Sequence, residues 1–144
     1  MMATAIQDRT KDDPERSVAL PLGATLFSFG YKYGFPDHGN LILDVRCLPN
    51  PYWEEEMRHL TGLDRSVADY VLQSPEGHQF VELALPLMCF VVQQAHIQGK
   101  ESFTCGIGCT GGHHRSVAVV EFLAQELRAK GFAVQVAHRD IGKE

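Results

Sequence analysis

The residues with the clearest chemical potential form one short run, Gly-Cys-Thr-Gly-Gly-His-His-Arg-Ser, at positions 108–116. Glycines at this spacing allow a tight turn that points several backbone N–H groups at one place. Hydroxyl and guanidinium donors beside such a turn match the oxygens of a phosphate or a similar anion. We therefore predict an anion-binding loop formed by Cys109, Thr110, Gly111, Gly112, His113, His114, Arg115 and Ser116. The alternative is an ordinary tight turn, with Arg115 paired to a surface acid.

The same run also contains the Cys-x5-Arg-Ser spacing of cysteine phosphatases. In such an enzyme Cys109 would be the nucleophilic thiolate, stabilised by the helix N-terminus and by Arg115. Phosphatases of this class usually carry a histidine directly before the cysteine, where this chain has Gly108. A general acid would also be needed, and Asp44 or Asp140 could only be guessed. We therefore expect no catalytic activity, and keep catalysis by Cys109 and Arg115 as the alternative.

Zinc is a further possibility to weigh, because cysteines and histidines gather in this region. Cys105, Cys109, His113 and His114 do not show the paired spacing of a zinc site. Cys105 is expected in the middle of a strand, as a buried and inert thiol. We predict solvent-facing histidines, no metal and no cofactor.

The predicted loop lies between a strand at 102–107 and a helix at 114–130, and a last strand follows at 132–137. A strand, a helix and a strand in this order form a βαβ unit, whose two strands pair in parallel. Further strands are predicted at 24–29 and, buried, at 40–46. The fold class is therefore α/β, a small and mostly parallel sheet with helices, with the anion-binding loop between the third strand and the following helix.

Helices are predicted in the middle of the chain. A short one is expected at 53–60, and a second runs to Leu72 after Asp64 as its N-cap. Ser74 and Pro75 begin a longer helix that ends near Gln98. Pro86 is expected to kink or split that helix.

Polar side chains also follow the other predicted strands. Because ligands of parallel sheets bind beyond the carboxyl ends of the strands, these residues are candidates for the same site. The candidates are Lys32, Asp44, Arg46, Asn50, His138 and Arg139, with Tyr31, Tyr33, Tyr52 and Trp53 as possible walls. For Asp44 and Arg46 a plain ion pair at the sheet edge is an equal alternative.

The whole chain of 144 residues has the length of one domain. Residues 1–21 are polar and predict a disordered or loosely attached arm, and residues 22–144 form the domain. The net charge of −5 argues against a general nucleic-acid binder. No apolar run approaches the ~18 residues of a membrane span, and no signal-peptide core is present. We expect a cytoplasmic protein, without a membrane partner, whose four cysteines are reduced.

A family resemblance rests on five segments of the sequence, taken in this order: 27–36, 44–53, 60–64, 106–118 and 138–140. The chain resembles the C-terminal domain of the RapZ (RNase adapter protein) family over nearly all of its length after the arm. Full-length members also carry an N-terminal nucleotide-binding domain with a P-loop. This chain has no Gly-x4-Gly-Lys-Ser/Thr, so ATP or GTP binding is not carried over.

The resemblance implies a domain that senses a phosphorylated amino sugar, glucosamine-6-phosphate, at the loop 109–116 with Asp44, Arg46 and Asn50 nearby. It also implies an RNA-binding adaptor to an endoribonuclease, and an oligomer is possible. Two departures bear on these roles. His113 replaces a lysine of some members, and the tail has Lys143 and Glu144 in place of a basic cluster. RNA binding is therefore expected to be weak.

Overall fold

The computed structural model describes residues 22–144, so the arm predicted at 1–21 lies outside the described residues. Parallel strands form the centre of the domain, and their order is β2-β3-β1-β4. The strands are β1 (Gly23–Gly30), β2 (Leu41–Asp44), β3 (Thr104–Cys109) and β4 (Ala133–His138). All three pairings are parallel, which confirms the predicted α/β class.

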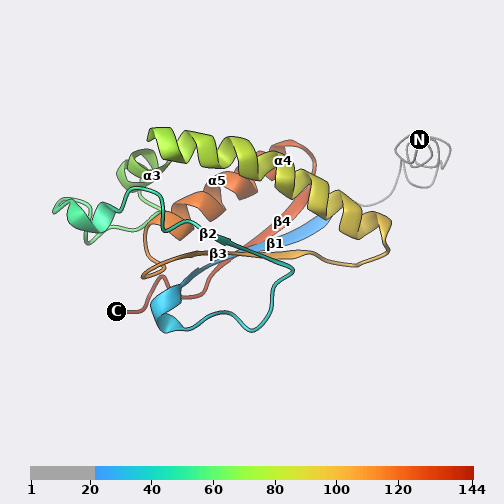
Figure 1. Cartoon of the computed structure of the whole chain (residues 1–144), viewed down its shortest axis with the longest axis horizontal. Coiled ribbons are helices and arrows are strands. Elements are labelled where there is room, and N and C mark those ends of the chain that lie inside the picture. Colours follow the sequence, from blue (N-terminus) through green and yellow to red (C-terminus); the bar gives the residue numbers. More distant parts are fainter. Residues whose placement is uncertain (1–21) are drawn as a thin grey trace.

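The helices of the described part lie on one side of this sheet (Figure 1). They are α3 (Arg65–Leu72), α4 (Pro75–Ile97) and α5 (Arg115–Ala129), with 3₁₀ turns η1 (Tyr31–Tyr33) and η2 (Pro51–Trp53). α5 packs directly on β1, β3 and β4, and α3 and α4 pack on α5. Fully buried Leu26, Ile107 and Leu123 lie in the resulting core. The crossover through α5 therefore positions its own N-terminus at the carboxyl ends of the strands.

Two predicted elements differ from the structure. The predicted helix at 53–60 is wrong, because η2 ends at Trp53 and separate turns follow it, such as Leu60 N–H bonded to Met57 O at 3.0 Å. The strand predicted to be buried is also different: β2 is short and its apolar residues are half-buried. Among residues 22–144, β2 lies at the edge of the sheet and pairs only with β3, so one of its edges lacks a strand neighbour there.

Pro86 does not split α4, which continues from Pro75 to Ile97. The missing N–H of Pro86 would have bonded the carbonyl of Glu82, and both residues are exposed. Water can reach that carbonyl, so the helix tolerates the loss.

By length and composition alone, α4 is long and apolar enough to cross a membrane, with a mean hydropathy of 1.5 over 18 residues. The expectation that no apolar run approaches that length is therefore wrong for this helix. Its buried residues, Ala84, Met88, Val92 and Ala95, belong to the core of the domain. Only 22% of that 18-residue window is buried, so most of the helix surface does not pack on the core.

Candidate functional site

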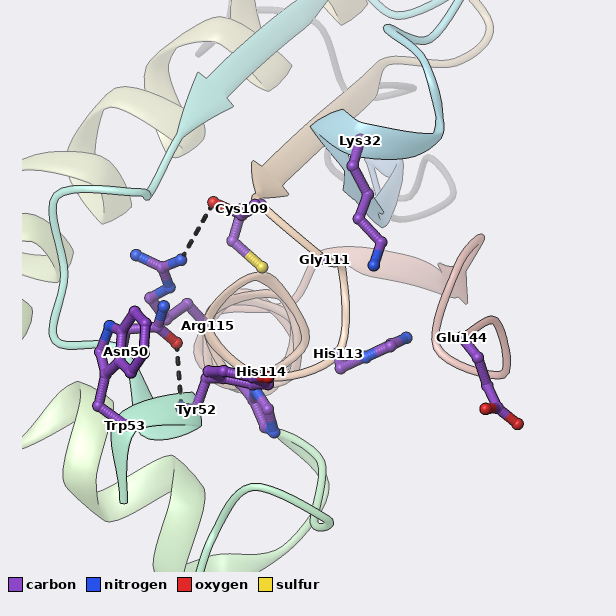
Figure 2. A pocket seen from close by; sticks show the side chains of 11 residues that line it. Lys32, Asn50, Tyr52, Trp53, Cys109, Gly111, His113, His114, Arg115 and Glu144 are labelled. Atoms are coloured by element: carbon purple, nitrogen blue, oxygen red, sulfur yellow. Dashed lines mark hydrogen bonds between the residues drawn. The ribbon is translucent and has the colours of Figure 1, made fainter. Parts of the chain in front are cut away.

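A cavity of about 610 Å³ opens beyond the carboxyl ends of β3 and β2. Figure 2 shows Lys32, His113 and Glu144 on one side of it, and Arg115, Asn50 and Trp53 on the other. Of the predicted site residues, those that line it are Lys32, Asn50, Cys109, Thr110, Gly111, His113, His114 and Arg115. Tyr52 and Trp53 line it as predicted walls, whereas Tyr31 and Tyr33 do not.

The loop between β3 and α5 is held by the end of β1. Lys32 N–H donates to the carbonyl of Thr110 at 3.1 Å. Gly112 lies against the backbone of Gly30 and has a φ of +76°, a conformation that glycine adopts without strain. The first residue of α5 therefore follows directly after a tightly packed turn.

Arg115 is the most buried cation of the cavity lining, with only 5% of its surface exposed. One guanidinium nitrogen, Nη1, donates to the carbonyls of Arg46 (2.7 Å) and Leu48 (3.3 Å). Nη2 donates to Thr110 Oγ1 at 3.4 Å, and Nε is buried and has no partner among residues 22–144. Within residues 22–144 no carboxylate forms an ion pair with it.

These contacts revise two expectations for Arg115. Nη1 is committed to backbone carbonyls that connect the chain after β2 to α5, so Nη2 and Nε are the parts of the predicted fork that remain for a phosphate. The alternative of a surface ion pair is not found in the described part. What remains is a buried positive charge beside the cavity with no negative partner, an arrangement that is costly unless an anion compensates it.

The two histidines were expected to face solvent, and this is wrong for His114, whereas His113 is half-buried. His114 is 8% exposed, and the Nε2 atoms of His113 and His114 are buried without a partner. The turn before α3 lies against this loop, with Gly62 N–H bonded to the carbonyl of His113 at 2.9 Å. Burial lowers the pKa of His114 below its ordinary 6.5, so the ring is neutral at neutral pH. A bound anion would favour the protonated ring.

Cys109 ends β3 at the cavity and is 2% exposed. Its Sγ–H donates to Ser116 Oγ (3.2 Å) and its sulfur accepts from Ser116 N–H (3.4 Å). Ser116 is fully buried and lies outside the cavity lining, so it positions Cys109 and does not reach a ligand there. Cys105 is buried in the core, where burial raises the pKa of its thiol to about 12. The described residues contain no cluster of metal-ligating side chains.

Residues 22–142 match the family model described as the RapZ C-terminal domain. The chain belongs to the RapZ C-terminal domain family. Curated relatives are called nucleotide-binding proteins. That of Parafrankia sp. (strain EAN1pec) is 49% identical over 85% of this chain and 43% of its own length. That of Streptomyces coelicolor is 45% identical over 85% of this chain and 41% of its own length. That of Desulforudis audaxviator is 43% identical over 85% of this chain and 42% of its own length. The chain thus spans less than half the length of these relatives.

In this RapZ C-terminal domain, Asp44 and Arg46 form the ion pair that was the alternative to a binding role. Arg46 Nη2 lies 2.7 Å from Asp44 Oδ2, and its guanidinium lies 3.9 Å from the ring centre of Tyr31. The hydrogen bond from Arg46 lowers the pKa of Asp44. Neither side chain lines the cavity, so Arg46 contributes its carbonyl, through Arg115.

His138 and Arg139 also lie outside the cavity. His138 bridges Ser28 and Glu121, with 2.7 Å to each, and Arg139 pairs with Asp140. The reason is the strand order: β4 is separated from β3 by β1, so its carboxyl end lies about 10 Å from that of β3. Glu144 lines the cavity although no local pattern marks it, because its position depends on how the tail leaves β4.

The carboxylate of Asp140 connects the end of β1 to the tail that follows β4. This fully buried carboxylate accepts from Gly30 N–H (2.7 Å) and pairs with Arg139 and Lys143, each at 2.8 Å. Burial alone would raise the pKa of Asp140, but the hydrogen bonds from Arg139, Gly30 and Lys143 outweigh it and lower the pKa to about 2. The group is therefore ionised in the folded domain at every ordinary pH.

Replacing Asp140 with asparagine is expected to lower the free energy of unfolding by about 2 kcal/mol at pH 7. The folded pKa of about 2 lies below the unfolded value, so this stabilisation is complete above about pH 4 and is lost as the pH falls toward 2. Urea unfolding at a series of pH values measures it. The variant should show a flatter pH dependence between pH 4 and 2 than wild type. Asp69→Asn, at a half-exposed carboxylate 3.7 Å from Arg65, is the control and should change the free energy of unfolding at pH 7 by no more than about 0.5 kcal/mol.

Proposed function

We propose that this domain binds a phosphorylated small molecule, with the phosphate at the N-terminus of α5 and the rest of the molecule in the cavity. The observation that carries the proposal is Arg115, a buried cation beside the cavity that has no carboxylate partner within the described residues and an unpartnered Nε. The unpartnered Nε2 atoms of His113 and His114 support it. The positive end of the helix dipole favours an anion at the same place.

The ligand class that we propose is an amino-sugar phosphate such as glucosamine-6-phosphate, sensed for regulation. Family resemblance suggests it, and the cavity offers suitable chemistry. Tyr52 and Trp53 are exposed at its mouth and can cover an apolar sugar face. Glu144 supplies a carboxylate for an ammonium group, and Lys32 supplies a second cation for the phosphate.

Calorimetric titration with glucosamine-6-phosphate tests this function. Glucose-6-phosphate lacks the ammonium group and glucosamine lacks the phosphate, so each measures one half of the recognition. We expect the order glucosamine-6-phosphate, glucose-6-phosphate, then glucosamine, from strongest to weakest. AMP is included because the relatives are called nucleotide-binding proteins. If AMP binds more tightly than glucosamine-6-phosphate, a nucleotide takes the place of the sugar phosphate as the proposed ligand. If none of the phosphorylated compounds binds, the proposal is refuted.

We expect no turnover of phosphate monoesters. Cys109 is only 2% exposed, and Gly108 stands where phosphatases of this class usually carry a histidine. The two carboxylates considered as general acids are occupied, Asp44 by Arg46 and Asp140 by Arg139 and Lys143. A nitrophenyl-phosphate assay measures the activity. Hydrolysis that disappears in Cys109→Ser would contradict this prediction and favour the cysteine phosphatase.

We also expect weak binding to structured RNA, with a dissociation constant no tighter than about 10⁻⁶ M at physiological salt. The tail offers Arg139 and Lys143 as its fixed cations, and both are paired with Asp140. The net charge of −5 adds general repulsion. A gel-shift titration against a hairpin RNA is the measurement. Nanomolar retention that falls steeply with added salt would favour the adaptor function instead.

A further inference from the structure

Two histidine rings of the cavity each have a nitrogen that no other described group satisfies. The Nε2 atoms of His113 and His114 are buried and have no hydrogen-bond partner among residues 22–144, and both residues line the cavity. Figure 2 shows the two rings next to each other, and their centres lie 6.3 Å apart. Leaving buried polar atoms unpaired is costly, so this arrangement favours a ligand that supplies their partner.

A neutral imidazole is a poor partner for an anion. It carries a single N–H, so one of its two nitrogens is an acceptor that repels negative oxygens. The protonated ring donates from both nitrogens, and its charge strengthens each bond. Burial is the main cause that lowers the pKa of His114 in the free domain; hydrogen bonds to the backbone of Leu60 and Arg58 oppose this, and His113 and Arg115 add to it.

The other ionisable groups that face the two rings come from several elements. In the cavity lining they are Arg115 of α5, Lys32 of η1, Cys109 of β3 and Glu144 of the tail. The turn before α3 carries Arg58, His59 and Asp64, which are exposed and lie outside the lining. Arg139, Asp140 and Lys143 of the tail pair with one another, also outside the lining.

The charges of the lining leave room for one proton when an anion is bound. Lys32 and Arg115 are positive and Glu144 is negative, while the thiol of Cys109 donates to Ser116. The positive surplus opposes protonation of the rings in the empty cavity. A dianion reverses the sign of the local charge, and one added proton restores neutrality. A second proton would place two like charges on neighbouring rings.

We propose that an anion binds at this site together with one proton, which the His113–His114 pair takes up to become an additional donor for that anion. This inference rests on the proposed function and adds its regulation, because the affinity for the anion then rises as the pH falls. Arg115 and Lys32 supply the part of the recognition that does not change with pH, and the two histidines supply the part that does.

Sulfate is the probe for the pH dependence, because its own charge is constant near neutral pH, whereas a phosphate monoester gains a proton near about pH 6. Trp53, the only tryptophan of the chain, lines the cavity, so its fluorescence and calorimetry can both follow the titration. Sulfate should bind roughly fivefold more weakly at about pH 8 than at about pH 6.5. Glucose-6-phosphate, titrated at about pH 7.5 in Tris and in HEPES, should give heats that differ by the uptake of about one proton.

Three variants locate the proton. The double variant His113→Gln/His114→Gln should bind sulfate weakly and without pH dependence. His113→Lys places a permanent charge at the half-buried position, so it should remove the proton uptake and bind sulfate more tightly than wild type at about pH 8. His59→Gln is the matched control, because His59 is exposed outside the cavity lining, and it should keep the full pH dependence. Circular dichroism verifies that each variant is folded.

The outcomes separate this inference from the proposed function. Equal affinities at about pH 6.5 and about pH 8, with no proton uptake, would overturn the inference and leave the proposed function standing. A pH dependence that persists in both the double variant and His113→Lys would place the proton on another group and overturn the inference as well. If neither sulfate nor a sugar phosphate binds at any pH, the proposed function itself is refuted, and the inference with it.

Discussion

Replacing Arg115 with alanine is expected to abolish phosphate-ligand binding and to lower the free energy of unfolding by about 3 kcal/mol. The guanidinium is the buried positive charge of the cavity, and it also bonds the carbonyls of Arg46 and Leu48. Truncation leaves both carbonyls without their donor. Calorimetric titration and urea unfolding of the same preparation measure the two losses separately.

Two further variants keep this result interpretable. Arg115→Lys preserves the charge but cannot span both carbonyls, so it should retain part of the ligand affinity while remaining less stable than wild type. Arg46→Ala removes a cation of the same type that lies outside the cavity, and its carbonyl stays in place. We expect unchanged ligand affinity for it. Equal losses in Arg46→Ala and Arg115→Ala would point to general electrostatics and contradict a built site.

Gly112→Ala is expected to cost about 3 kcal/mol of stability and to disrupt the anion-binding loop. The φ of +76° disfavours any residue with a Cβ. That Cβ would also lie 2.7 Å from the backbone nitrogen of Gly30 and 3.0 Å from Asp140 Cβ. The clash would displace the Gly30 N–H from the Asp140 carboxylate, which it now meets at 2.7 Å.

The neighbouring glycine is the matched control. A Cβ on Gly111 would meet nothing closer than His113 Nδ1 at 3.8 Å, and Gly111 has no positive φ. Gly111→Ala should therefore change the free energy of unfolding by no more than about 0.5 kcal/mol. Thermal or urea unfolding without ligand compares the two variants. Similar stabilities would show that the loop accommodates a Cβ at Gly112, and would contradict the tight packing of Gly112 against Gly30.

Local pattern was sufficient for much of the fold. Apolar runs followed by Gly-rich turns predicted β1 and β3, and the apolar run after Gly131 predicted β4. The Ser74-Pro75 pair predicted the start of α4. The alternation of strand, loop, helix and strand predicted parallel pairing around α5. Local pattern failed at 53–60, where the turns after η2 follow contacts with distant parts of the chain, such as Tyr70 Oη–H donating to Glu54 Oε2.

For the site as well, features that depend on near neighbours in the sequence could be predicted, and long-range contacts could not. The sequence by itself determined the composition of the Cys109–Ser116 loop and its place before a helix, because glycine content and helix starts depend on near neighbours. Only the tertiary structure decided which strand ends share the cavity, since the order β2-β3-β1-β4 keeps His138 and Arg139 away from it. Likewise, Arg115 meets carbonyls that lie more than sixty residues earlier in the chain. Such long-range contacts form only when the whole domain packs, so no local spacing could reveal them.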